Sequence, residues 1–144
     1  MRKVSRSALV PYSAAQMFAL VKDVEAYPAF LPWCNEAEVH IRGEDFIEAS
    51  LGLQRGRVSK RFRTRNVFRE AEFLGIELVG GPFRHLSGGW QFRQLGDAGS
   101  RVELELEFAF ESRATDVIFG RFFEHTCNTL VDAFTRRAAD VYAG

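Results

Sequence analysis

The stretch RVELELEFAFESRATDVIFGRFFEHTCNTL (residues 101–130) changes its hydrophobic period partway along. Between Leu104 and Phe110 every second residue is apolar and most of the others are glutamate, the pattern of a strand with one buried and one solvated face. From Thr115 onward the apolar residues recur at intervals of three and four, which predicts an amphipathic helix to about residue 142. A half-buried strand followed by a long one-sided helix favours the α+β class.

The rest of the chain extends this sheet toward the N-terminus. Period-two segments predict strands at 3–10, 35–42, 45–53, 56–68, 71–79, 84–94 and 100–111, with the last six joined by short turns such as QRG and VGGP. SAAQMFALV (13–21) predicts a helix with a Ser13–Gln16 capping box. In DVEAYPAFLPWC (23–34) two prolines limit any helix to a short turn. We expect a curved seven-stranded antiparallel sheet around the long C-terminal helix, with Thr115 as its N-cap and a close backbone approach at Gly120.

Composition bounds the function. A length of 144 residues predicts one domain spanning 1–144, and fourteen phenylalanines predict a thick aromatic core or a cavity for an apolar guest. Nineteen basic and nineteen acidic residues cancel, which argues against a general nucleic-acid binder and against DNA as a partner. No segment reads as a signal peptide or membrane span. We therefore expect a cytoplasmic protein that contacts, at most peripherally, the inner face of the cell membrane.

Catalysis and metal binding are not expected. The two cysteines, Cys34 and Cys127, are far apart and lack metal-ligand spacing, so we interpret them as buried free thiols. His40, His85 and His125 are scattered, and no carboxylate is spaced with any of them as an acid/base pair. The sequence therefore predicts no catalytic residue, no metal site and no enzymatic activity.

A cleft between the long helix and the concave sheet is the expected ligand site. The lining that strand parity, helix spacing and the YPAFLP segment predict comprises Phe30, Trp33, Lys60, Phe62, Thr64, Phe83, Trp90, Phe92, Leu106, Phe108, Phe119, Phe123, Cys127 and Leu130. A solid aromatic core is the alternative, and composition alone does not choose between them. YPAFLP itself is either a lid over one end of the cleft or an entrance that touches a membrane.

SKRFRTRN (59–66) raises a second site on the opposite face of the sheet. If Phe62 points inward, Arg57, Arg61, Arg63 and Arg65 point outward as a local positive patch for ribosomal RNA or anionic headgroups. The alternative is a solvated strand face partly paired with Glu48. The same parity sends Lys60 inward, where it would donate to a polar atom of a ligand unless a bulge near Gly56 moves it outside.

Six segments resemble a known family almost end to end: ALVPYSAAQMF (8–18), LVKDVEAYPAFLPWC (20–34), SKRFRTRN, GPFRHLSGGWQF (81–92), FGRFFEH (119–125) and DAFTRRAADVY (132–142). They resemble the START-like proteins grouped as RatA and the coenzyme Q-binding proteins, within the polyketide cyclase/dehydrase-like superfamily. The resemblance implies a helix-grip (START/Bet v 1-like) fold with a hydrophobic tunnel and offers no agreed catalytic motif.

That resemblance implies two functions. The first expectation is non-enzymatic binding of an isoprenoid quinone such as ubiquinone, supporting respiration, with Lys60 or Thr64 as the polar handle and no cofactor beyond that ligand. The alternative is a RatA-type toxin that binds the large ribosomal subunit through the arginine strand and blocks subunit association.

Overall fold

The alternating segment at 101–111 forms the strand on which the helices pack. In the computed structural model, which describes residues 1–143, strand β7 (Gly99–Phe110) buries its even-numbered residues and leaves all of its odd-numbered ones except Ala109 exposed or half-buried. The other strands are β1 (Arg2–Val10), β2 (Cys34–Arg42), β3 (Phe46–Arg55), β4 (Val58–Arg69), β5 (Phe73–Gly80) and β6 (Phe83–Leu95). All seven predicted strands are confirmed, with ends shifted by two residues at most.

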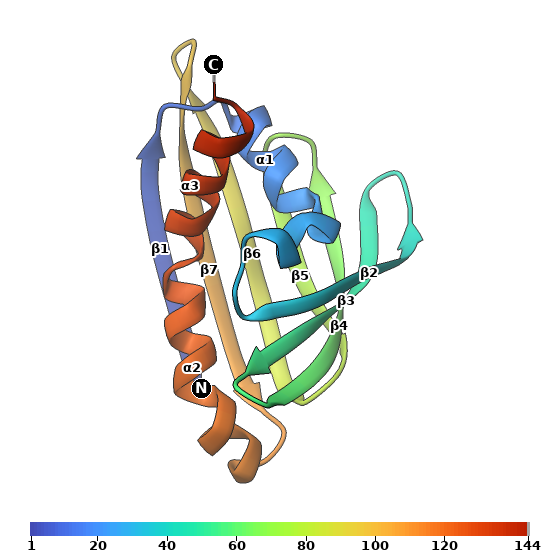
Figure 1. Cartoon of the computed structure of the whole chain (residues 1–144). Coiled ribbons are helices and arrows are strands. Elements are labelled where there is room, and N and C mark those ends of the chain that lie inside the picture. Colours follow the sequence, from blue (N-terminus) through green and yellow to red (C-terminus); the bar gives the residue numbers. More distant parts are fainter. Residues whose placement is uncertain (144) are drawn as a thin grey trace.

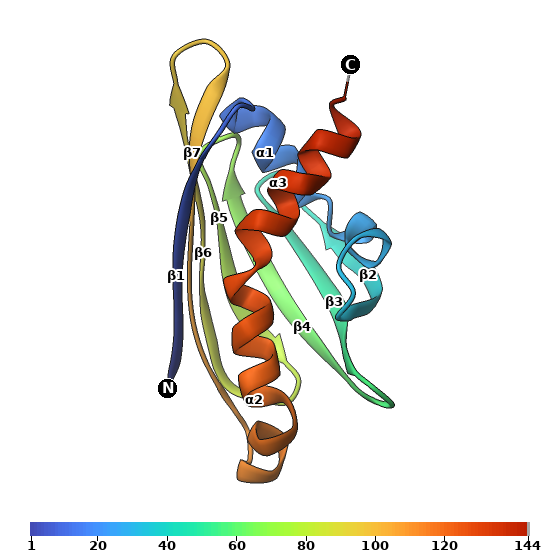
Figure 2. The same ribbon diagram turned by 60° about the vertical axis from the view of Figure 1, so that its left-hand side comes forward.

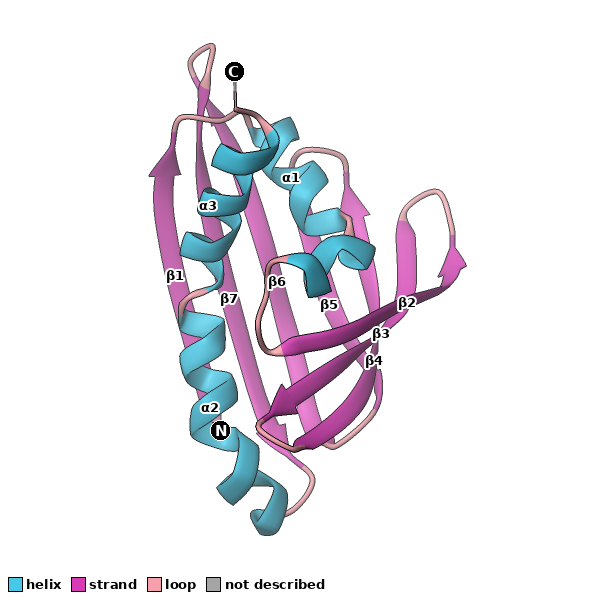
Figure 3. Ribbon diagram, in the orientation of Figure 1, coloured by secondary structure: helices cyan, strands magenta, loops and turns pink. Residues whose placement is uncertain are grey.

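The strands form one antiparallel sheet in the order β1-β7-β6-β5-β4-β3-β2. β2 to β7 are a meander, and β1 closes the far edge by pairing with β7. The sheet curves around its helices, and the helices lie on its concave face (Figures 1, 2 and 3). This is the α+β arrangement that the sequence pattern predicted and the helix-grip fold that the family resemblance implied.

The two short helices after β1 are also confirmed. Helix α1 (Ala14–Lys22) begins with the predicted capping box, in which Ser13 accepts from the Gln16 amide and Gln16 accepts from the Ser13 amide. A 3-10 helix, η1 (Val24–Ala29), contains Pro28 and ends before Pro32. Proline lacks the donor that a longer helix would need, so the chain turns there into β2.

The C-terminal helix differs from its prediction in two ways. It begins one turn earlier, because Ser112 rather than Thr115 is the cap: the Thr115 amide donates to the Ser112 hydroxyl at 3.1 Å. It is also two helices, α2 (Arg113–Asn128) and α3 (Leu130–Val141). At the junction the Thr129 hydroxyl donates to the Thr126 carbonyl at 2.7 Å, and its amide donates to the same carbonyl. Such local bonds bend a helix, and the bend keeps both halves over the curved sheet.

Glycine permits two close approaches. Gly88 in β6 has a φ of 136°, and a Cβ there would lie 2.0 Å from the Glu105 carbonyl oxygen of β7. Gly120 in α2 leaves space for the Arg2 guanidinium of β1, since a Cβ would lie 2.5 Å from Arg2 Nη2. The close approach predicted at Gly120 therefore exists, but a side chain makes it and not the backbone.

Candidate functional site

A small apolar cavity lies between the concave sheet, η1 and the C-terminal helices. Its volume is about 70 Å³. Of the predicted cleft residues, the structure places eight in its lining: Trp33, Phe62, Thr64, Trp90, Leu106, Phe123, Cys127 and Leu130. No charged side chain belongs to the lining. The cavity is therefore suited to an uncharged apolar molecule.

Seven further lining residues escaped the sequence analysis: Tyr27, Leu51, Asn66, Leu74, Ile76, Leu86 and Phe134. Two signals were available for part of this set. Asn66 shares the inward parity of Phe62, and Phe134 continues the apolar stripe of the C-terminal helix by one turn beyond Leu130. The others depend on which parts of the sheet the helices cover, a property of tertiary packing.

Five predicted cleft aromatics do not line the cavity. Phe83, Phe92, Phe108 and Phe119 are buried in the packed core, where Phe83 stacks on Phe110 with ring centroids 4.6 Å apart. Phe30 is half-buried beside Phe134. Much of the phenylalanine therefore fills space. At 70 Å³ the cavity is far below the roughly 300–1,000 Å³ of typical ligand pockets, and a ring-and-tail quinone would need side chains to move.

The YPAFLP segment packs onto its own domain. Tyr27 and Phe30 place their rings edge-on to Phe134, with centroids 5.4 and 5.2 Å away. The Tyr27 hydroxyl donates to the Val21 carbonyl, and burial raises the pKa of this phenol. Leu31 is buried as well. This arrangement matches the lid described above and leaves contact with a membrane as a prediction.

Besides Tyr27, three side chains with polar nitrogen or oxygen atoms line the cavity. The Thr64 hydroxyl donates to Asn66 Oδ1 at 3.0 Å, and both residues are buried. Trp33 differs, because its buried indole Nε1 finds no hydrogen-bond partner among residues 1–143. A buried donor without an acceptor costs about 1–3 kcal/mol. Such an atom is expected where another molecule, or another side-chain conformation, supplies the acceptor.

Both thiols are buried and free, as the composition predicted. Burial raises the pKa of Cys34 to about 11 and raises that of Cys127 still further. Neither thiol is therefore activated as a nucleophile.

Lys60 is not an inward charge. It lies opposite Leu53 on the face that Phe62 shares, so the parity prediction is right. Its side chain is nevertheless exposed and does not line the cavity, because this end of β4 extends beyond the buried part of the sheet. The proposed bond from Lys60 to a ligand inside the cleft is therefore wrong, and no bulge near Gly56 is needed to explain its exposure.

A second, open space adjoins the cavity through one shared side chain. It is a groove of about 450 Å³ between the loop before β2, the β3–β4 hairpin and α2. Its walls are Pro32, Trp33, Gln54, Arg55, Gly56, Phe122, His125, Thr126 and Thr129. Arg55 bridges the groove, with its guanidinium 5.8 Å from the Phe122 ring centroid and a hydrogen bond to the Ile118 carbonyl. Trp33 lines both the groove and the cavity.

Carboxylates neutralise two of the four arginines in the predicted patch. Arg61 forms ion pairs with Glu36 and Glu38 of β2, at 3.3 and 3.2 Å. Arg63 Nε donates to Glu48 at 2.7 Å, which is the partial pairing left open above. Arg65 lies 4.0 Å from the Phe46 ring centroid. Of the four arginines, only Arg57 has neither a carboxylate nor an aromatic ring as a partner within residues 1–143.

Unpaired positive charge gathers instead at one end of the molecule. The start of α2, the β3–β4 hairpin and the β5–β6 turn lie together there (Figures 1 and 2). The cations at this end are Arg55, Arg57, Lys60, Arg84, Arg113 and Arg121; all are exposed, and none forms an ion pair with a carboxylate in the described part of the chain. We call these six residues the basic end.

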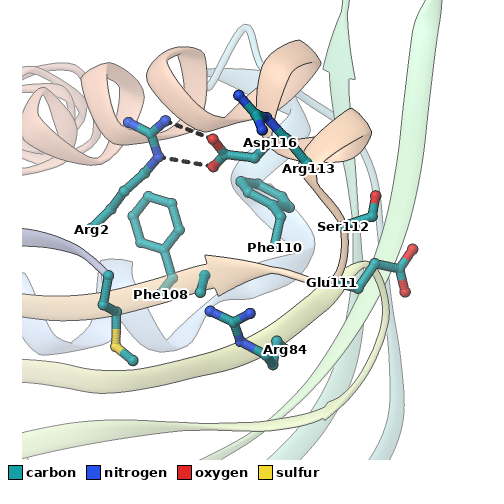
Figure 4. A pocket seen from close by; sticks show the side chains of 10 residues that line it. Arg2, Arg84, Phe108, Phe110, Glu111, Ser112, Arg113 and Asp116 are labelled. Carbon is teal, nitrogen blue, oxygen red and sulfur yellow. Dashed lines mark hydrogen bonds and ion pairs between the residues drawn. The ribbon is translucent and has the colours of Figure 1, made fainter.

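The α2 side of the basic end surrounds a pocket of about 470 Å³. Figure 4 shows Arg84 and Arg113 among its walls, and Arg2 in a two-bond pairing with Asp116. Arg2 Nε and Nη2 donate to the two carboxylate oxygens at 3.0 Å each, and Nη1 donates to Glu124 at 2.7 Å. Arg2 lowers the pKa of Asp116, while the carboxylates raise the pKa of Arg2. Arg2 is thus engaged, whereas Arg84 and Arg113 remain free to bind an anion.

Two histidines have a carboxylate neighbour, contrary to the sequence expectation. His85 Nε2 lies 4.0 Å from Glu107 Oε1 and 3.0 Å from the Ser87 hydroxyl, and His40 makes similar contacts. His40 Nε2 lies 2.8 Å from the Ser50 hydroxyl, and its Nδ1 lies 3.7 Å from Glu38. This trio faces outward on the sheet, and none of the cavities described above is lined by it. Within residues 1–143 no cluster of side chains could hold a metal ion, and no helix is long and apolar enough to cross a bilayer.

Comparison with known proteins assigns the family. The family model described as "Polyketide cyclase / dehydrase and lipid transport" matches residues 10–135, which is most of the chain. The chain belongs to this family. The chain is also similar to the ribosome association toxin RatA of Vibrio cholerae, with 45% identity over 99% of both chains. The mitochondrial coenzyme Q-binding protein COQ10 of Dictyostelium discoideum is more distant, at 24% identity over 91% of this chain and 66% of that protein.

Solved structures share the fold of this family. The Zhui aromatase/cyclase from Streptomyces sp. R1128 superposes with a TM-score of 0.84, covering 99% of this chain and 96% of its own, at 17% identity. At that identity the likeness establishes the fold and carries no information about activity.

Proposed function

We propose that this protein associates with ribosomes through its basic end, as a RatA-type protein that contacts the large subunit and blocks subunit association. The observation that carries the proposal is the full-length relationship to the Vibrio cholerae toxin, far closer than the relationship to the quinone-binding relative. This reverses the order of the two functions that the sequence suggested, and such a role belongs in the cytoplasm.

The basic end offers a physical reason for ribosome contact. Its six cations are exposed and none has a carboxylate partner among the described residues, so they are available to RNA phosphates. Arginine binds phosphate oxygens through two parallel hydrogen bonds. The residues Val58, Val117 and Ile118 at the same end are exposed and apolar, and they can pack against a ribosomal surface once the charges have met.

Co-sedimentation with purified large ribosomal subunits tests this proposal. Binding of the parent protein should weaken steeply between 50 and 200 mM salt, because RNA contacts release counterions. Arg57→Glu combined with Lys60→Glu should reduce binding and lower the salt slope by roughly 1.4–1.8. The matched control is Arg93→Glu with Arg136→Glu, which changes the net charge equally at the opposite end. Equal losses in both pairs would contradict a localised contact.

A second candidate function is binding of an apolar molecule in the inner cavity. An uncharged lining with the Thr64–Asn66 pair supports it, and isoprenoid quinones are one class of guest that the coenzyme Q-binding relative suggests. Native mass spectrometry and lipid extraction of freshly purified protein test it. A co-purifying polyprenyl species would support quinone binding, and an empty protein that rejects added apolar probes would contradict it.

A further inference from the structure

Trp33 stands between two spaces of different character. One is the apolar inner cavity, which Trp33 shares with Phe123, its edge-on neighbour at a centroid distance of 6.1 Å. The other is the open groove, which Trp33 shares with Phe122. The backbone at Trp33 is held, since its carbonyl accepts from the Gln54 amide at 2.8 Å. Rotation of the side chain alone would thus join the two spaces without unfolding the segment.

The volumes favour a site in which these two spaces join when a guest binds. The inner cavity holds about 70 Å³, which is smaller than the roughly 150 Å³ known to admit benzene in an engineered protein core. The groove holds about 450 Å³, within the usual range of ligand sites. A guest that extends from the groove into the cavity therefore displaces the indole of Trp33.

The same indole carries the unpaired donor. Trp33 Nε1 is buried and has no acceptor among residues 1–143. By contrast, the two hydroxyl groups of the lining, those of Tyr27 and Thr64, both donate hydrogen bonds. An indole N–H can donate but cannot accept. The group that completes it is consequently an acceptor, and the absence of charged residues from the cavity lining favours a neutral oxygen over a carboxylate or phosphate.

We propose that Trp33 is a movable wall between the groove and the inner cavity, and that its indole N–H donates a hydrogen bond to the guest. The guest is an uncharged, mainly apolar molecule with a carbonyl or similar acceptor oxygen. This inference rests on the proposed binding of an apolar molecule and adds to it the route of entry and the chemical feature that is recognised.

The test uses two probes of nearly equal shape, acetophenone and ethylbenzene, which differ in the carbonyl oxygen. The chain has two tryptophans, so its ¹⁵N–¹H spectrum contains two indole signals, and a Trp90→Phe sample serves to assign them. In the parent protein acetophenone should bind about three- to tenfold more tightly than ethylbenzene, the usual net effect of one neutral hydrogen bond. Acetophenone, and not ethylbenzene, should move the Trp33 indole proton downfield.

Trp33→Phe keeps an aromatic ring and removes the donor. In this variant the two probes should bind with equal affinity. Equal affinities already in the parent, with no movement of the indole signal, would overturn the donor role and leave apolar binding intact. Failure of both probes to bind the parent would instead overturn the binding function and the inference with it.

The role of Trp33 as a movable wall is tested by the rate at which a probe enters and leaves the cavity. Trp33→Ala should speed the exchange of ethylbenzene between free and bound states, measured by NMR line shapes, because the barrier to entry is removed. An unchanged exchange rate would overturn the wall. If Trp33→Ala does not fold, Trp33→Leu, which retains bulk but is narrower than indole, should show the same direction of change.

Discussion

At the scale of single residues, Gly88 is a position where the sheet has no room for a side chain. Its φ of 136° and the Glu105 carbonyl 2.0 Å from a would-be Cβ act together. We expect Gly88→Ala to lower the free energy of unfolding by at least about 2 kcal/mol, measured by urea denaturation. Gly80→Ala in β5 is the control, since nothing lies within 4 Å of its would-be Cβ. A similar loss in both variants would contradict this explanation.

The thiol of Cys34 provides a prediction for pH dependence. Burial disfavours the thiolate and raises the pKa to about 11, so at pH 8 the thiolate is roughly two orders of magnitude scarcer than in an exposed cysteine. A Cys127→Ala protein should therefore react very slowly with a thiol reagent at pH 8 and faster as the pH approaches 11. The neutral thiol favours the folded state, and this contribution is lost between about pH 8.5 and 11. Rapid reaction at pH 8 in folded protein would contradict the burial.

Reasoning from the sequence correctly predicted which face of a strand a residue lies on. It did not predict which residues of that face the helices cover. The alternation around Phe62 correctly placed Thr64 and Lys60 on one face of β4. It could not show that Thr64 is covered and Lys60 exposed, because coverage depends on where the helices end over the sheet. Pairing was equally inaccessible: the glutamates that neutralise Arg61 come from β2, and their register depends on two irregularities in the β2–β3 ladder.

At the scale of elements, the Arg2–Asp116–Glu124 cluster holds α2 against β1, with Gly120 beneath the guanidinium. These side chains are partly exposed, so the cluster contributes about 1 kcal/mol at most. Gly120→Ala should be nearly neutral, because about 1 kcal/mol of helix propensity offsets the displaced arginine. In an Arg2→Ala background the same change should be stabilising.

The coupling between Arg2 and Gly120 is measured by thermal or urea unfolding of four proteins: the parent, Arg2→Ala, Gly120→Ala and the double variant. Arg2 lowers the pKa of Asp116, so the contribution of the pair is present at neutral pH. It is lost as the pH falls below about 3.9 and through the lowered pKa of the folded state. The effect of Arg2→Ala should shrink correspondingly in acid. Strict additivity of the two substitutions at pH 7 would contradict the contact.

The elements themselves were largely predictable, because strand alternation, turn residues and the Ser13 cap are local signals. The division of the C-terminal helix at Thr129 was not. The segment CNTLVD has no proline or glycine, and its apolar spacing continues through the junction. The bend adapts the helix to a curved sheet formed by residues far away in sequence. The local sequence pattern therefore predicts one continuous helix.

At the scale of the whole molecule, two candidate functions use different regions that touch at one point. The inner cavity is apolar and lined mostly by buried residues, and the basic end is exposed and charged. Arg55 and Gly56 of the β3–β4 hairpin also line the groove that Trp33 separates from the cavity. A guest that enters by the groove therefore passes beside the surface proposed to meet the ribosome.

Two variants can separate these functions. Cys127→Leu adds bulk to the cavity from α2, where leucine suits the helix, and should abolish binding of acetophenone and ethylbenzene while leaving co-sedimentation with large subunits intact. Arg57→Glu with Lys60→Glu should have the opposite effect, since neither side chain lines the cavity. Circular dichroism and urea unfolding verify that both variants fold. If each folded variant lost both activities, the two sites would not be independent, and the groove beside Arg55 would be the place where ligand and ribosome compete.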